Sequence, residues 1–187
     1  MPKQNKQSNR VNQRGAESES ENQQTDNDLQ ELFLDELADV YNAEQQLTKA
    51  LPKMAKAAQS DELRQALEEH LEETEEHVTR LEKVAESIDE TLKRKTCQAM
   101  KGLLAEGEDI VKEQKDSSAL DAGIIAACQK VEHYEIASYG TLCAWAEQLG
   151  HDAALKLLRQ TEEEESAADE KLSEVAEGIA NQRAQAE

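Results

Sequence analysis

Apolar residues recur along the chain at steps of three and four positions, the spacing that gathers them on one face of an α-helix. Four such stretches predict long helices, over about 28–59, 60–88, 119–149 and from 151 onwards. A shorter amphipathic helix is predicted around 97–112, inside the connection between the second and third long helices. Ser60 is a typical helix-capping residue and Gly150 a typical helix stop, so they separate the members of each pair.

Two closely connected helix pairs joined by one long crossover are typical of the ferritin-like four-helix bundle, since an up-and-down bundle would have short loops throughout. A shift of 91 residues also aligns the first pair with the second without a gap, which places Glu44 on Glu135 and Glu73 on Glu164. We therefore predict an all-α, ferritin-like four-helix bundle with a long crossover that carries a short extra helix. The two hairpins would be related by a pseudo-twofold axis.

Residues 1–27 contain almost no apolar side chains, so this segment cannot offset the entropy that ordering would cost. A weakly basic stretch is followed there by an acidic one, which would suit a docking segment, although a solvated extension is the simpler interpretation. We predict a disordered polar tail over 1–27, followed by one bundle domain over 28–182.

Composition supports a helical protein and narrows the classes of function. Aromatic residues make up 3% of the chain, too few for most sheet proteins, and the formal net charge is −20. Such a chain lacks the cationic face that nucleic acids and anionic membranes attract, and no apolar run approaches the roughly 18 residues of a membrane span. The three cysteines form no Cys-x-x-Cys pair and no secretory signal is visible, so we expect a soluble, cytoplasmic protein that binds neither nucleic acid nor membrane.

Carboxylates interrupt the apolar stripe near the middle of each long helix. In the first helix, Glu44 lies between Val40 and Leu47. In the third, Glu135 lies between Val131 and Leu142, with Glu132 one turn earlier. In the second helix, the positions between Leu67 and Leu81 that fall on the stripe are His70, Glu73 or Thr74, and His77. In the fourth, the positions between Leu158 and Leu172 that fall on the stripe are Thr161, Glu164 or Glu165, and Ala168.

Buried carboxylates repel one another and are costly unless they are neutralised. Few of the 21 basic side chains lie on these stripes, so protons or cations must do this. Two divalent metal ions, bound by carboxylate oxygens and imidazole nitrogen, would meet the need. The separation of 29 residues between Glu44 and Glu73 recurs between Glu135 and Glu164, which would place facing carboxylates at similar depth.

Two histidines and two tyrosines lie near the same level of the bundle. His70 is three residues before Glu73 and His77 is four after it, so either could be a metal ligand, although a hydrogen-bonded core histidine is the commoner arrangement. Tyr41 and Tyr139 could each donate a hydrogen bond to a carboxylate that holds a metal ion, and simple packing would explain them equally well.

The most distinctive motifs are Leu37-Ala-Asp-Val-Tyr-Asn-Ala-Glu44-Gln-Gln-Leu47, His70-Leu-Glu-Glu-Thr74, Glu132-His-Tyr-Glu-Ile-Ala-Ser-Tyr139 and Thr161-Glu-Glu-Glu-Glu-Ser-Ala-Ala-Asp-Glu-Lys-Leu172. Together they resemble the YciF-like family, a ferritin-like family linked with stress responses in bacteria, over about residues 28–180. The resemblance implies a dimeric, rubrerythrin-like bundle with a dinuclear metal site. By motif, its ligands would be Glu44, His70, Glu73, Glu132, Glu135 and Glu164, with His77 as the alternative histidine.

The chain departs from the common ferritin-like pattern, which has Glu-x-x-His on two helices. No Glu-x-x-His occurs here, so the site would be richer in carboxylate and poorer in histidine. We expect two iron ions, with manganese or another divalent metal as the alternative.

Two functions fit these features. In the first, a di-iron centre oxidises Fe(II) or reduces peroxide, as a ferroxidase or peroxidase that depends on an external reductant. In the second, the chain is a non-catalytic, acidic helical-bundle stress protein that acts by protein–protein interaction. A homodimer is expected in either case, and a cage that stores iron is a weaker third alternative. Metal content after native purification would separate the first two.

Overall fold

The computed structural model describes residues 8–185, and every regular element in that range is helical. The first hairpin consists of α1 (Ser8–Ala57) and α2 (Asp61–Ser87), and the second of α4 (Leu120–Leu149) and α5 (Asp152–Val175). The crossover between them carries α3 (Gln98–Glu113). A π-helical turn, η1 (Ala176–Ala180), and the short α6 (Asn181–Ala184) continue α5 to the end of the described chain. The all-α prediction is confirmed.

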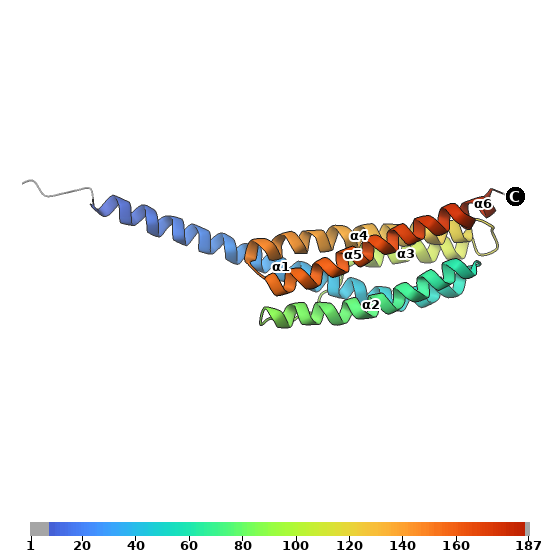
Figure 1. Ribbon diagram of the computed structural model, residues 1–187, viewed down its shortest axis with the longest axis horizontal. Coiled ribbons are helices and arrows are strands. Elements are labelled where there is room, and N and C mark those ends of the chain that lie inside the picture. Colours follow the sequence, from blue (N-terminus) through green and yellow to red (C-terminus); the bar gives the residue numbers. More distant parts are fainter. Residues whose placement is uncertain (1–7, 186–187) are drawn as a thin grey trace, which may run out of the picture.

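The four long helices form one bundle. α1 packs against α2 and α4, and α5 packs against the same two helices, which closes the bundle. Figure 1 shows α3 running along α4, in agreement with its contacts to α1 and α4. Within the described residues, no helix is both long enough and apolar enough to cross a membrane.

The start of α1 differs from the sequence-based boundary. The helix begins at Ser8 rather than near residue 28, and its first part extends beyond the other helices in Figure 1. The absence of apolar periodicity in this segment predicts that the segment buries little apolar surface. This absence does not predict whether the segment forms a helix. Residues 8–27 contain no proline and a single glycine, so no strong helix breaker forces the helix to end there. The tail prediction also covers residues 1–7, which lie outside the described residues.

The turns that join the paired helices were read correctly from the sequence. Ser60 is the N-cap of α2 and its hydroxyl accepts a hydrogen bond from the amide of Leu63, at 3.4 Å. Gly150 ends α4 in the left-handed region, with φ of 74°, which a residue with a side chain adopts less readily. The buried carboxylate of Asp121, at the start of α4, accepts hydrogen bonds from the amides of Gln59 and Ser60, and so ties the first turn to the second hairpin.

A polar layer divides the apolar core into two clusters. One contains Leu47, Leu51, Leu63, Leu67, Ile124, Val131 and Leu172. The other contains Phe33, Leu37, Val40, Leu81, Val84, Leu142 and Leu158. In α1 the change from one cluster to the other falls between Val40 and Leu47, and the other three long helices change cluster at their predicted interruptions too. The interruptions therefore share one level, as the sequence predicts.

Candidate metal centre

Six titratable side chains meet in the polar layer, and each is at most 6% exposed. They are Glu44 of α1, His70 and His77 of α2, Glu132 and Glu135 of α4, and Glu165 of α5. We call them the buried cluster. Their possible ligand atoms form two groups, His70 with Glu132, Glu135 and Glu165, and Glu44 with His77 and Glu165, in each of which the atoms lie within 4.8 Å of one another.

Glu165 is common to both groups. Its Oε2 atom lies 3.8 Å from Nε2 of His70, and its Oε1 atom lies 3.0 Å from Nδ1 of His77. The first imidazole is also 3.4 Å from Oε2 of Glu132, and the second is 3.5 Å from Oε1 of Glu44. Each histidine thus directs one nitrogen into the cluster, and the two oxygens of Glu165 face different histidines.

The other nitrogen of each histidine faces a more exposed carboxylate. Nδ1 of His70 lies 3.4 Å from Glu73, whose side chain is 51% exposed, and Nε2 of His77 lies 2.9 Å from Glu164, whose side chain is 31% exposed. Each imidazole is therefore held between an inner and an outer carboxylate. Outer carboxylates of this kind fix the orientation and protonation of histidines that bind metals.

Two further side chains complete the surroundings of the cluster. Arg80, which is 8% exposed, donates hydrogen bonds to Thr161 and to Glu164, so a guanidinium covers the outer side of His77. The buried hydroxyl of Tyr139 donates a hydrogen bond to Oε1 of Glu44. Arg80 was not identified from the sequence, although it lies three residues after His77 and one before Leu81.

The cluster contains many polar atoms without a hydrogen bond, although some of them face one another as ion pairs, such as Nδ1 of His77 and Oε1 of Glu165. Within the described residues, eight buried side-chain nitrogen and oxygen atoms lack a hydrogen bond, and all eight belong to these six residues. Both oxygens of Glu135 and both of Glu165 are among them. Buried polar atoms in proteins are otherwise almost always paired, so their concentration in one layer points to a ligand that supplies the missing interactions.

Protonation can offset part of the cost of this cluster. Burial, together with the neighbouring carboxylates, raises the pKa of Glu132 and Glu135 well above the usual range. Burial would lower the pKa of both histidines, but the carboxylates around them outweigh it and raise the pKa of His70 to about 9 and that of His77 to about 10. Burial favours the neutral form of Glu165 as well, yet its contacts with the two histidines lower its pKa. A metal ion and these protons would compete for the same atoms.

Comparison with known proteins identifies the family. A family model described as a domain of unknown function, DUF892, matches residues 28–185. Protein YciF of Escherichia coli strain K12 is 46% identical over 158 residues, which cover 84% of this chain and 95% of that protein. The chain belongs to the YciF-like family. The resemblance noted in the sequence motifs is thereby confirmed.

Solved structures agree with the fold of this YciF-like chain. The crystal structure of the E. coli stress protein YciF matches with a TM-score of 0.79 and 47% identity, over 82% of this chain and 97% of that one. A protein from Xanthomonas campestris pv. campestris, at 20% identity, matches with a TM-score of 0.66 over 83% and 95% of the two chains, and it shows the fold alone.

The structure brings together most of the site that the YciF-like motifs imply. Glu44, His70, Glu132 and Glu135 lie in the buried cluster, and so does His77, the alternative histidine. Glu73 and Glu164 do not, because they lie behind the two histidines, and Glu165 takes the position expected for Glu164. Tyr139 contacts Glu44 as expected. Tyr41 instead donates a hydrogen bond of 2.7 Å to Glu82.

The place of Glu73 and Glu164 outside the buried cluster has a simple geometric cause. The 91-residue repeat pairs these two glutamates because they are identical, but the buried residues at this level are their neighbours, Thr74 and Glu165. The buried residues of α2 follow steps of three and four, and on α5 the same steps lead from Leu158 through Thr161 to Glu165. Strict use of this spacing would have selected Glu165, because one residue turns the helix by about 100°.

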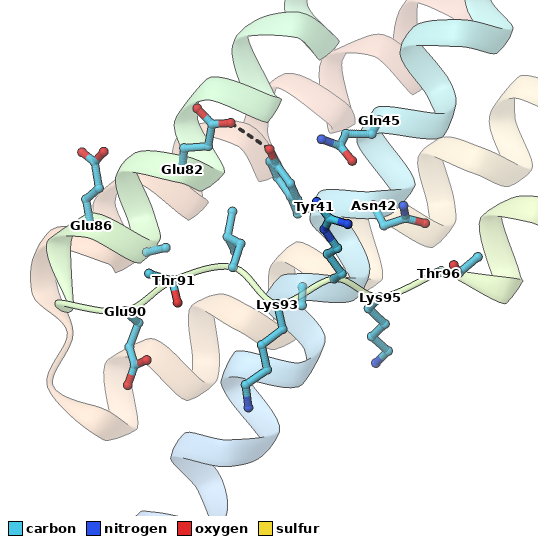
Figure 2. Close-up of a pocket in the computed structure, with 14 residues that line it drawn as sticks. Tyr41, Asn42, Gln45, Glu82, Glu86, Glu90, Thr91, Lys93, Lys95 and Thr96 are labelled. Carbon is cyan, nitrogen blue, oxygen red and sulfur yellow. Dashed lines mark hydrogen bonds between the residues drawn. The ribbon is translucent and has the colours of Figure 1, made fainter.

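A large cavity of this YciF-like chain lies away from the cluster. It has a volume of about 710 Å³ and is bounded by α1, α2 and the crossover segment around Lys93. Figure 2 shows the hydrogen bond between Tyr41 and Glu82 at this cavity, and no member of the buried cluster lines it. A smaller cavity of about 270 Å³ lies between α2 and α5 and reaches His70 and Glu132. The candidate site is therefore defined by the side chains of the buried cluster and not by the cavity of about 710 Å³.

Proposed function

We propose that this chain is a stress protein that binds two divalent metal ions, iron by preference, in the buried cluster, and that it oxidises Fe(II) or reduces peroxide there. The observation that carries the proposal is the group of eight buried polar atoms without a hydrogen bond on four glutamates and two histidines. Four carboxylates in one dry layer need positive charge, and divalent cations supply it together with the missing interactions.

The two groups of ligand atoms support two ions rather than one. His70, Glu132, Glu135 and Glu165 would hold the first, and Glu44, His77 and Glu165 the second. Both oxygens of Glu165 are without a hydrogen bond and they face different histidines, which suits a carboxylate shared between two ions. Carboxylate oxygen and imidazole nitrogen are ligands that suit both iron and manganese.

The residues around the cluster favour redox chemistry of bound iron. Two iron(II) ions, when bound, would supply the two electrons that reduce one peroxide molecule, with two protons, to two molecules of water. Glu73 and Glu164 hold the imidazoles in place, and the apolar clusters on both sides of the layer exclude water. The three cysteines are buried and unpaired, so we assign re-reduction of the oxidised centre to an external reductant.

The stress role follows from the E. coli relative, which is a stress protein. We extend that role to this chain on the identity of 47%, and we propose a cytoplasmic homodimer as its working form. If metal proved absent, the non-catalytic, acidic bundle acting by protein contacts would be the remaining interpretation.

The proposal is tested by mixing the anaerobic, Fe(II)-loaded protein with peroxide and following absorbance by stopped flow. We expect oxidation faster than that of free Fe(II), and we expect Glu165→Gln to remove the acceleration because it removes the shared anionic ligand. Glu163→Gln is the matched control, since Glu163 is an exposed neighbour on the same helix and should react like the wild type. Oxidation no faster than that of free Fe(II) would favour the non-catalytic function.

A further inference from the structure

The cavity between α2 and α5 reaches two members of the buried cluster. His70 and Glu132 line it, and so do the small side chains of Ala66 and Ala168, one from each helix. Its volume of about 270 Å³ leaves room for a cation that still carries water molecules. The cluster is thus reached from the side of His70.

Two of the polar atoms that lack a hydrogen bond belong to residues that line the cavity. Nε2 of His70 and Oε2 of Glu132 are buried without a hydrogen bond, although they lie 3.4 Å apart. The opposite nitrogen of His70 contacts Glu73, whose side chain is half exposed. The imidazole of His70 therefore contacts the exposed carboxylate of Glu73 with one nitrogen and faces the buried carboxylate of Glu132 with the other.

The two hairpins differ at the positions that control this opening. At the offset of 91 residues, His77 of α2 corresponds to Ala168 of α5, so one hairpin places an imidazole where the other has only a methyl group. On the side of His77, the buried guanidinium of Arg80 bonds to Glu164 and Thr161 and would repel a cation. On the side of His70, Ala168 leaves the cavity open.

The surroundings of the cavity are acidic. Glu69, Glu73 and Glu164 line it, together with Lys171 and the imidazole of His70. An adjoining cavity of about 300 Å³ shares Glu69 and adds further carboxylates from both helices, Glu62 and Glu174. Clefts lined by one sign of charge concentrate ions of the opposite sign and speed their association.

We propose that this cavity is the entrance through which hydrated divalent metal cations reach the buried cluster. The inference rests on the proposed metal binding. Glu69 and Glu73 attract the cation at the surface, His70 and Glu132 are the first buried groups that it meets, and Ala168 keeps the passage open. The side of His77 stays closed by Arg80.

The test is the rate at which metal-free protein takes up Co²⁺, followed by stopped flow through the visible absorption of bound cobalt. Ala168→Leu narrows the passage without replacing a proposed ligand, so it should slow uptake several-fold and leave the final number of bound ions unchanged. Ala153→Leu makes the same change at an exposed position on α5 outside the cavity, and it should load at the wild-type rate.

A charge variant gives a second, independent measurement in case Ala168→Leu does not fold. Glu69→Lys should slow uptake about tenfold at low ionic strength, and added salt should narrow the difference from wild type. Glu76→Lys makes the same change of net charge on an exposed part of α2 outside both cavities, and should have a smaller effect.

The outcomes separate this inference from the proposed function. If wild type binds Co²⁺ but Ala168→Leu and Glu69→Lys both load at its rate, the entrance lies elsewhere and the inference is wrong. If wild type binds no Co²⁺ at equilibrium, metal binding itself is wrong. Slower uptake by either variant to the wild-type endpoint, with a smaller effect or none in its control, supports the entrance.

Discussion

Nε2 of His77 lies 2.9 Å from the carboxylate of Glu164, while the other nitrogen of the same ring points into the buried cluster. The carboxylate is held in turn by Arg80, whose positive charge lowers the pKa of Glu164 below its usual value against the opposing effect of burial. Glu164 is therefore a charged group that orients the imidazole from behind, and we infer that it is not itself a ligand.

This relationship predicts a limited defect for Glu164→Gln. The variant should still bind two metal ions per chain, but with an affinity about 10- to 100-fold lower, because the ring loses the anion that orients it. Isothermal titration of metal-free protein measures both quantities, with Glu163→Gln as the control. Loss of one bound ion, with no change in the affinity of the other, would instead make Glu164 a ligand.

Replacing a buried carboxylate should stabilise the metal-free protein. Glu135→Leu removes a carboxylate with two unpartnered oxygens and adds apolar surface to the core, so its melting temperature without metal should exceed that of wild type. Glu44→Leu should gain less, because the hydroxyl of Tyr139 then loses its acceptor. Thermal melts followed by circular dichroism compare the two variants. A lower melting temperature for Glu135→Leu than for wild type would mean that Glu135 supports the fold through an unseen partner.

The stability of the metal-free protein should fall as pH rises above neutrality. Both histidines have a folded-state pKa, about 9 and about 10, above the usual value of 6.5, so their stabilising effect is complete below pH 6.5 and is lost as pH rises through the folded values. The raised pKa values of Glu132 and Glu135 act in the same direction, because the stability that protonation of these carboxyl groups provides is lost as pH rises above 4.5.

Thermal melts between about pH 6 and about pH 10 check this expectation. The metal-free protein should melt at progressively lower temperature, and the metal-loaded protein should depend less on pH, because the ions replace the protons. Equal pH dependence with and without metal would contradict it.

The N-terminal segment should contribute little to stability. Figure 1 shows the first part of α1 extending beyond the bundle, and the family model begins at residue 28. Deletion of residues 1–25 should leave the melting temperature and the metal content nearly unchanged. A marked fall in melting temperature would show that this segment packs on the domain.

The sequence predicts the helices and the level of the site well because both follow from one periodic pattern. The apolar stripes that stop at Val40 and resume at Leu47 mark the polar layer, and Ser60 and Gly150 carry local signals for helix ends. These features depend on neighbouring positions in the chain, so they can be read without knowledge of the packing.

The identity of the ligands and of their partners depends on packing and is therefore harder to predict from the sequence. Within the run from Glu162 to Glu165, adjacent glutamates differ by a rotation of about 100°, so an error of one position along the helix selects a different glutamate. The contact of Arg80 with Glu164 joins residues 84 positions apart, and no periodic signal marks it. The start of α1 was misplaced because burial and local helix propensity are separate properties.

The number of metal ions bound per chain tests the central claim most directly. Metal-free protein would be titrated with Co²⁺ by calorimetry, and the dialysed complex analysed for cobalt by mass spectrometry, for wild type and for Glu165→Gln. We expect two ions per chain in wild type and a clear loss in the variant, because Glu165 is shared by both groups of ligand atoms. Fewer than one ion per wild-type chain, or two ions retained by Glu165→Gln, would contradict the proposed centre.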